Sequence, residues 1–162
     1  MSLTDLFQAL ENTAIGMAIS SSELLFPIVE SLHVVALTLV VGTIAVVDLR
    51  LLGAGAARRA ASKLMDEVLP ITRWAFVGAA ITGGLLFSSR ATVYAANPAF
   101  IAKMAVLALA LVNIAYFHRI TMRGIAQWDT ASHPPAAVKL AGALSLSGWI
   151  AVVALGRWVG FL

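Results

Sequence analysis

Residues 24–47 read LLFPIVESLHVVALTLVVGTIAVV, and this stretch decides the fold class. It lies between Glu23 and Asp48, and its ionisable side chains are Glu30 and His33 alone. A helix needs about 20 mostly apolar residues to cross a bilayer, because each backbone amide must find its hydrogen-bond partner within the helix. Residues 24–47 therefore predict a membrane-spanning helix.

Further apolar stretches at 68–89, 98–117 and 136–162 satisfy the same criterion. The composition agrees, since 60% of the 162 residues are hydrophobic and 12% are charged, whereas soluble domains carry about 25% charged residues. This shortage of charge excludes an ordinary water-soluble fold and a nucleic-acid-binding module, and the absence of cysteine excludes disulfide frameworks and thiol catalysis. We therefore expect an all-α fold in the lipid bilayer. Residues 23–162 are expected to form a four-helix up-down-up-down bundle, and residues 1–22 a short interfacial helix.

Lys and Arg are distributed unevenly between the two ends of the expected bundle. One end carries Arg50, Arg58, Arg59, Lys63, Arg73, Arg119, Arg123 and Lys139, and the other carries Arg90, Lys103 and Arg157. Cytoplasmic loops of membrane proteins carry the excess of positive charge. The distribution therefore predicts a multi-pass protein of the bacterial inner membrane with both termini outside.

Ionisable residues inside the expected spans are candidate functional residues, because each costs at least about 2.5–3.5 kcal/mol in the hydrocarbon region. Counting about 1.5 Å per residue along each helix puts Glu30, His33 and Lys103 in the outer half of the bundle. The same count puts His118 at the cytoplasmic rim, roughly 20 Å from His33 along the membrane normal. Two histidines so far apart cannot hold one metal, so we predict a single ligand site in the outer half.

The residue types at this depth suit a porphyrin. An imidazole binds iron, glycines admit a flat ring, and arginines pair with propionates. His33 is the candidate metal ligand, and the other candidate cofactor-binding residues are Glu30, Lys103, Gly83, Gly84, Arg90 and Trp149. Glu30 would fix the imidazole tautomer or relay a proton. Lys103 would ligate iron as a neutral amine or pair with a propionate.

The residues leave three interpretations open. The first is a protein that binds haem b and acts in electron transfer or haem-linked redox chemistry with a redox partner. The second is a membrane protein that handles copper or another small solute through Glu30, His33 and Lys103, with Met104 as a further candidate. The third is a cofactor-free structural subunit in which these side chains hold helices together.

Two further expectations concern packing. Asp48 and Arg50 are expected to form a charge pair at the cytoplasmic end. The Gly156-x3-Gly160 spacing lets helices approach closely, which would suit a homodimer.

Two segments resemble a known group of proteins. Residues 30–53, which begin Glu-Ser-Leu-His and end Asp-Leu-Arg-Leu-Leu-Gly, and the run Asn97-Pro98-Ala-Phe-Ile-Ala-Lys-Met resemble the first and third helices of small bacterial four-helix integral membrane proteins of unknown function. More distantly, the chain is similar to the copper-resistance D-like membrane domain and to the haem-binding membrane protoporphyrinogen oxidase. The resemblance to the oxidase implies a b-type haem with His33 as axial ligand and Lys103 nearby. The resemblance to the copper family implies periplasmic copper handling.

Overall fold

A computed structural model describes residues 2–54 and 59–162 of the chain. The elements in order are α1 (Leu3–Glu11), α2 (Ala14–Ser21), α3 (Leu25–Leu52), α4 (Ala61–Ser89), α5 (Ala91–Ala96), α6 (Pro98–Arg119), the 3₁₀ turn η1 (Thr121–Gly124), α7 (Ile125–Trp128) and α8 (Ala136–Trp158). Four of these, α3, α4, α6 and α8, are long and apolar enough to cross a membrane. No strand occurs in the part of the chain that the structure describes. The predicted all-α, multi-pass membrane fold is therefore confirmed.

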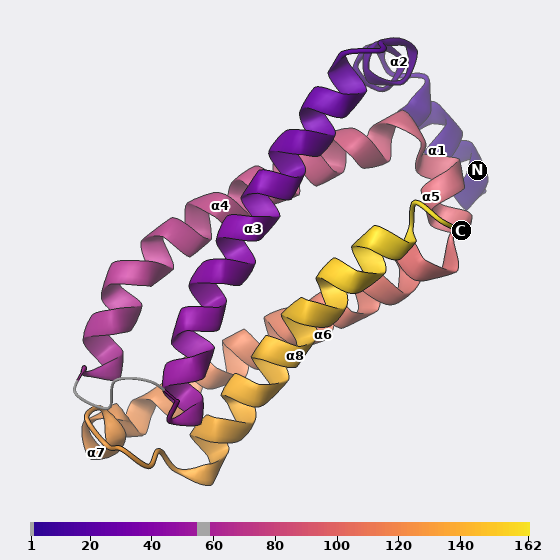
Figure 1. The fold of residues 1–162 in the computed structure, drawn as a ribbon. Helices are drawn as coiled ribbons and strands as arrows, with labels where there is room; N and C mark the ends of the chain where they lie inside the picture. The colour runs from indigo at the N-terminus through magenta and orange to yellow at the C-terminus, as the bar shows by residue number, and fades with distance from the viewer. Residues whose placement is uncertain (1, 55–58) are drawn as a thin grey trace.

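The four long helices lie side by side in the order α4, α3, α8, α6 (Figure 1). Helix α3 packs against α4 and α8, and α8 packs against α6. Over residues 2–54 and 59–162, α4 and α6 make no contact of comparable extent. The bundle is therefore open along the side between α4 and α6.

The two ends of the bundle differ in what they carry. Both chain termini lie at one end, here called the terminal end, and α7 lies at the other, here called the loop end (Figure 1). The helix bounds place Arg50, Arg59, Lys63 and Arg119 at the loop end, in keeping with the uneven charge distribution. Arg58, which belongs to the same basic group, lies outside the described residues.

Both local and distant signals set the ends of the helices. Asn97 caps α6, because its side chain accepts hydrogen bonds from the first amides of that helix, and Pro98 occupies the first helical position. Helix α3 ends at Gly53, whose φ of 84° is the left-handed conformation that glycine adopts without strain. Helix α4 begins before the predicted start at residue 68, because Asp129 caps it from the other side of the loop end. The Asp129 carboxylate accepts from the Ser62 amide at 2.7 Å and the Ser62 hydroxyl at 2.8 Å.

The N-terminal segment forms two helices, α1 and α2, which pack against α5 and α4 at the terminal end. The Glu11 carboxylate accepts hydrogen bonds from the Thr92 amide and the Thr92 hydroxyl, both at 2.7 Å. Gly16 allows a close approach, since a Cβ there would lie 2.7 Å from the Ser88 carbonyl oxygen. The segment is therefore docked onto the bundle by specific contacts.

The loop end is held by Arg50, which is only 5% exposed. Its Nε donates to the Arg59 carbonyl oxygen at 3.0 Å, and its Nη2 donates to the Asp129 carbonyl oxygen at 2.7 Å. The expected Asp48–Arg50 charge pair is therefore wrong: within the described ranges the single ion pair joins Arg59 to Glu67. Arg50 therefore donates to backbone carbonyl groups of the loop end, because buried carbonyl groups need a hydrogen-bond donor.

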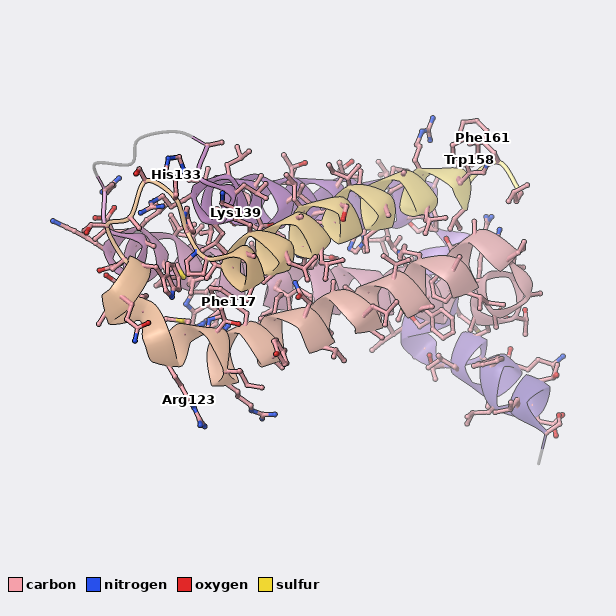
Figure 2. All side chains as sticks on the ribbon, turned by 90° about the horizontal axis from the view of Figure 1, so that it is seen from below. Phe117, Arg123, His133, Lys139, Trp158 and Phe161 are labelled. Atoms are coloured by element: carbon pink, nitrogen blue, oxygen red, sulfur yellow. The ribbon has the colours of Figure 1, made fainter. Side chains whose placement is uncertain are left out.

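Apolar side chains fill the space between the helices. Figure 2 shows Phe117 directed into the bundle near the loop end, whereas Arg123 points away from it. Phe117 belongs to a buried cluster with Trp128 and Val138, and a second cluster around Val40 and Trp149 lies nearer the middle. Cavities remain beside this core, and their lining includes residues of α4 and α6, the two helices that are apart.

Gly156, the first glycine of the Gly156-x3-Gly160 pair, packs against another helix of the same chain. A Cβ at Gly156 would lie 3.5 Å from Lys103 Cδ, so Gly156 faces α6 of the same molecule. Helix α8 ends at Trp158, before Gly160. Gly156 is therefore packed within the chain, and the homodimer stays a prediction.

Candidate functional site

A cavity of about 430 Å³ lies in the terminal half of the bundle, on the side between α4 and α6. We call it the histidine cavity. It is lined by five of the residues that the sequence singled out: His33, Gly83, Gly84, Lys103 and Trp149. Nearly all of its remaining lining is aliphatic or aromatic, so its interior is an apolar space of the size that small molecules and cofactors occupy.

The imidazole of His33 is held by a threonine of the neighbouring helix. His33 is half-buried, and its Nδ1 lies 2.9 Å from Thr82 Oγ1. The single hydroxyl proton of Thr82 is donated to the Gly78 carbonyl oxygen at 2.7 Å. With the hydroxyl proton in that position, the imidazole donates from Nδ1 to Thr82, and Nε2 keeps a free lone pair. A neutral imidazole in this state is a metal ligand.

The two adjacent glycines of α4 have different roles. A Cβ at Gly83 would lie 3.0 Å from Cε1 of His33, so this glycine makes room for the imidazole itself. A Cβ at Gly84 would meet nothing within 4 Å, so Gly84 borders open space in the cavity. Gly83 therefore positions the histidine, and Gly84 leaves room for a flat group beside it.

Lys103 and Glu30 are separated by the fold. Lys103 is half-buried and lines the histidine cavity, with its Nζ 5.4 Å from the centroid of the Phe100 ring. Glu30 is exposed and does not line the cavity. Its carboxylate has no hydrogen bond or ion pair to His33 or Lys103 in the described part of the chain. Thr82, and not Glu30, is therefore the hydrogen-bond partner of His33 at Nδ1.

Aromatic rings border the histidine cavity at the terminal end. Phe87 and Phe100 stack with their centroids 5.4 Å apart, and Tyr94 stacks on Phe100 at 5.6 Å. Arg90 is exposed and lies outside the cavity lining, with its guanidinium 5.4 Å from the centroid of the Phe26 ring. The terminal end of the cavity is thus built from rings, and the arginine that the sequence proposed for this edge lies apart from it.

Trp149 lies at the floor of the cavity and is 2% exposed. Its ring meets that of Phe76 edge-on, with centroids 6.3 Å apart. The indole Nε1 has no hydrogen-bond partner among the described residues, although buried indole N–H groups usually have one. The indole N–H of Trp149 therefore keeps an unused capacity to donate a hydrogen bond.

A second cavity, of about 340 Å³, lies towards the loop end. It shares Phe76 and Trp149 with the histidine cavity and is lined in addition by His118 and Asp48. The two histidines therefore border different cavities, as the depth count required.

Sequence reasoning missed Thr82 as a site residue, although a signal for it was present. Thr82 lies on the same helical face as Ala79 and Gly78, three and four residues earlier, in the small-residue pattern that predicts close helix contact. That pattern indicated where α4 meets a neighbour, and the structure adds that the neighbour presents His33.

Comparison with known proteins gives one match. The family described as "Family of unknown function (DUF6644)" matches residues 12–162, a range that includes all four long helices and both cavities. No curated protein matches the chain, and no solved structure matches it. The chain belongs to the DUF6644 family of unknown function.

Proposed function

We propose that this chain binds a b-type haem in the histidine cavity and acts in electron transfer or haem-linked redox chemistry. One observation carries the proposal: His33 lines an apolar cavity of about 430 Å³ and its Nδ1 lies 2.9 Å from Thr82 Oγ1. With the Thr82 proton on the Gly78 carbonyl oxygen, Nδ1 is the donor and Nε2 is free to bind iron. A histidine oriented by a hydrogen bond at its other nitrogen is the usual form of an axial ligand. The distant resemblance to the haem-binding membrane protoporphyrinogen oxidase that the sequence motifs suggest would imply the same ligand.

The residues around the cavity fit this group. His33 would ligate the iron, and Gly84 would leave space for the ring. Lys103 would pair with a propionate, and the free Nε1–H of Trp149 would donate to a polar edge. Haem supplies a one-electron iron couple when bound. The apolar lining excludes water, which strengthens each of these electrostatic contacts.

The basic residues at the loop end support a location in the bacterial inner membrane with the terminal end outside. In that orientation the histidine cavity lies in the outer half of the bilayer. A redox partner would then reach the cavity through the outer end or through the lipid-facing opening between α4 and α6.

Copper handling is the second candidate. Met104 lines the same cavity as His33, so a thioether and an imidazole border one space, and both are copper ligands. Within the described residues no group of three or more histidine, cysteine or carboxylate side chains is gathered. Copper would therefore have few ligands in this cavity, whereas haem supplies four nitrogen ligands to its own iron.

The visible absorption spectrum of detergent-purified protein tests the proposal. We expect a Soret band that shifts on reduction and disappears in His33→Ala, with unchanged helix content by circular dichroism. His118→Ala is the matched control, because His118 borders the other cavity and should leave the band intact. A colourless preparation with stoichiometric copper would instead support the second candidate. A preparation that takes up neither group would overturn both.

A further inference from the structure

We infer that the cavity at the loop end, here called the aspartate cavity, is a binding site for a lipid-soluble organic cation, with Asp48 as its counter-ion. The carboxyl group of Asp48 is 3% exposed and borders this space of about 340 Å³. Its Oδ2 has no hydrogen-bond partner among the described residues. A buried carboxylate oxygen without a partner is costly. The Ser145 hydroxyl and the Trp149 indole N–H border the same cavity, but neither carries a charge, so among the described residues Asp48 lacks a counter-ion.

The neighbours of Asp48 are engaged elsewhere. Arg50, two residues further along α3, donates to backbone carbonyls of the loop end. Asn113 donates to the Ala141 carbonyl oxygen at 3.0 Å. Arg73 and His118 border the cavity, but both are exposed, and in the described ranges neither forms an ion pair with Asp48. Within residues 2–54 and 59–162, no positively charged side chain therefore pairs with Asp48.

Close packing of α8 shields Asp48 on one side. A Cβ at Gly142 would lie 3.1 Å from the Asp48 carbonyl oxygen and 3.0 Å from Leu51 Cβ, so only glycine lets α8 approach α3 so closely. The lining residues on α4 and α6, where the bundle is open, include Val77 and Leu111, both exposed. The route of entry is therefore from the lipid side, which favours a lipid-soluble ligand.

The rest of the lining selects the kind of cation. Phe76, Phe117 and Trp149 border the same cavity, and the faces of aromatic rings attract organic cations. Most other lining residues are aliphatic, which suits an apolar body attached to the charge. A hard metal ion needs six or more oxygen ligands, and the described residues gather no cluster of three carboxylate, histidine or cysteine side chains. A quaternary or protonated amine with an aromatic or branched apolar group fits the cavity best.

Binding of benzyltrimethylammonium to the purified protein in neutral detergent tests this inference. We expect saturable binding, measured by equilibrium dialysis, that weakens at least about tenfold in Asp48→Asn, as for loss of a charge-assisted contact. Asp66→Asn is the matched control, because Asp66 is an exposed carboxylate near the same end and should leave the affinity unchanged.

A second comparison does not depend on the variant. Neopentylbenzene has the same shape as benzyltrimethylammonium with carbon in place of the charged nitrogen, and it should compete weakly for the site in the unaltered protein. Equal competition by the neutral compound, equal affinity in Asp48→Asn, or the absence of saturable binding would each overturn the inference. The test needs no haem, so it is independent of the function proposed for the histidine cavity.

Discussion

His33 Nδ1 lies 2.9 Å from Thr82 Oγ1 across the contact between α3 and α4. Because Thr82 passes its own proton to the Gly78 carbonyl, this contact sets the tautomer of the imidazole and leaves Nε2 available. The hydrogen bond joins the functional candidate of one helix to a side chain of the next, so the geometry of the site depends on how these two helices pack.

Removal of the Thr82 hydroxyl should weaken ligand binding more than it weakens the fold. In Thr82→Val the imidazole loses the acceptor that orients it, and loss of such a partner typically costs about 10–100-fold in metal-site affinity. Titration with haem, followed at the Soret band, measures the change. Thr38→Val is the control, because Thr38 bonds only its own helix at the Val34 carbonyl oxygen. Equal affinities in the two variants would show that Thr82 does not position the imidazole.

Alanine at the two glycines of α4 should have different consequences. Gly83→Ala places a methyl group 3.0 Å from His33 Cε1, so it should displace the imidazole and lower both stability and haem affinity. Gly84→Ala meets no atom within 4 Å and gains up to about 1 kcal/mol of helix propensity, so the ligand-free protein should be at least as stable as the original. Haem uptake by Gly84→Ala should nevertheless fall, because the methyl group enters the cavity. Thermal unfolding and haem titration of both variants make the comparison, and full haem uptake by Gly84→Ala would argue against a flat ligand there.

The docking of the N-terminal helices should weaken in acid. Hydrogen bonds from the Thr92 hydroxyl and amide hold the pKa of the Glu11 carboxyl below its ordinary value of 4.5. A group whose pKa is lowered in the folded state stabilises that state above its ordinary pKa, and this stabilisation is lost as the pH falls through the folded-state pKa. The Thr92 amide proton should therefore shift in NMR spectra below about pH 4.5, and Glu11→Gln should abolish the shift. Glu23→Gln, which changes an exposed carboxylate, should preserve it.

Loss of the Arg50 side chain should destabilise the loop end strongly. Its two hydrogen bonds satisfy carbonyl groups of Arg59 and Asp129, and hydrogen bonds of charged groups contribute about 1.5–3 kcal/mol each. Arg50→Leu should therefore lower the free energy of unfolding by a few kcal/mol in a denaturant titration in mixed micelles. Arg123→Gln is the control, because Arg123 points away from the bundle (Figure 2). A loss of similar size in both variants would point to a general effect of charge.

The sequence by itself determined the four spans, the class of the fold and the depth of the candidate residues. A helix in hydrocarbon must satisfy its own backbone, so a run of apolar residues such as 24–47 suffices to identify a span, and distance along the chain converts directly into depth. Local chemistry also set the start of α6 at Pro98, whereas α3 continues beyond the expected end at residue 47 to Leu52. For the same reason the positions of His33 and Lys103 along their helices were enough to assign both residues to one half of the bundle.

Only the tertiary structure decided what each side chain meets. Glu30 and His33 are three residues apart at a similar depth, which predicted that they interact. In the structure Glu30 is exposed, and Nδ1 of His33 contacts Thr82 instead. Asp48 likewise borders a cavity, whereas its neighbour Arg50 donates a hydrogen bond to a backbone carbonyl of the loop end. These outcomes depend on the rotation of each helix about its axis. That rotation is set by the packing of all four helices together, which spacing along one helix does not encode.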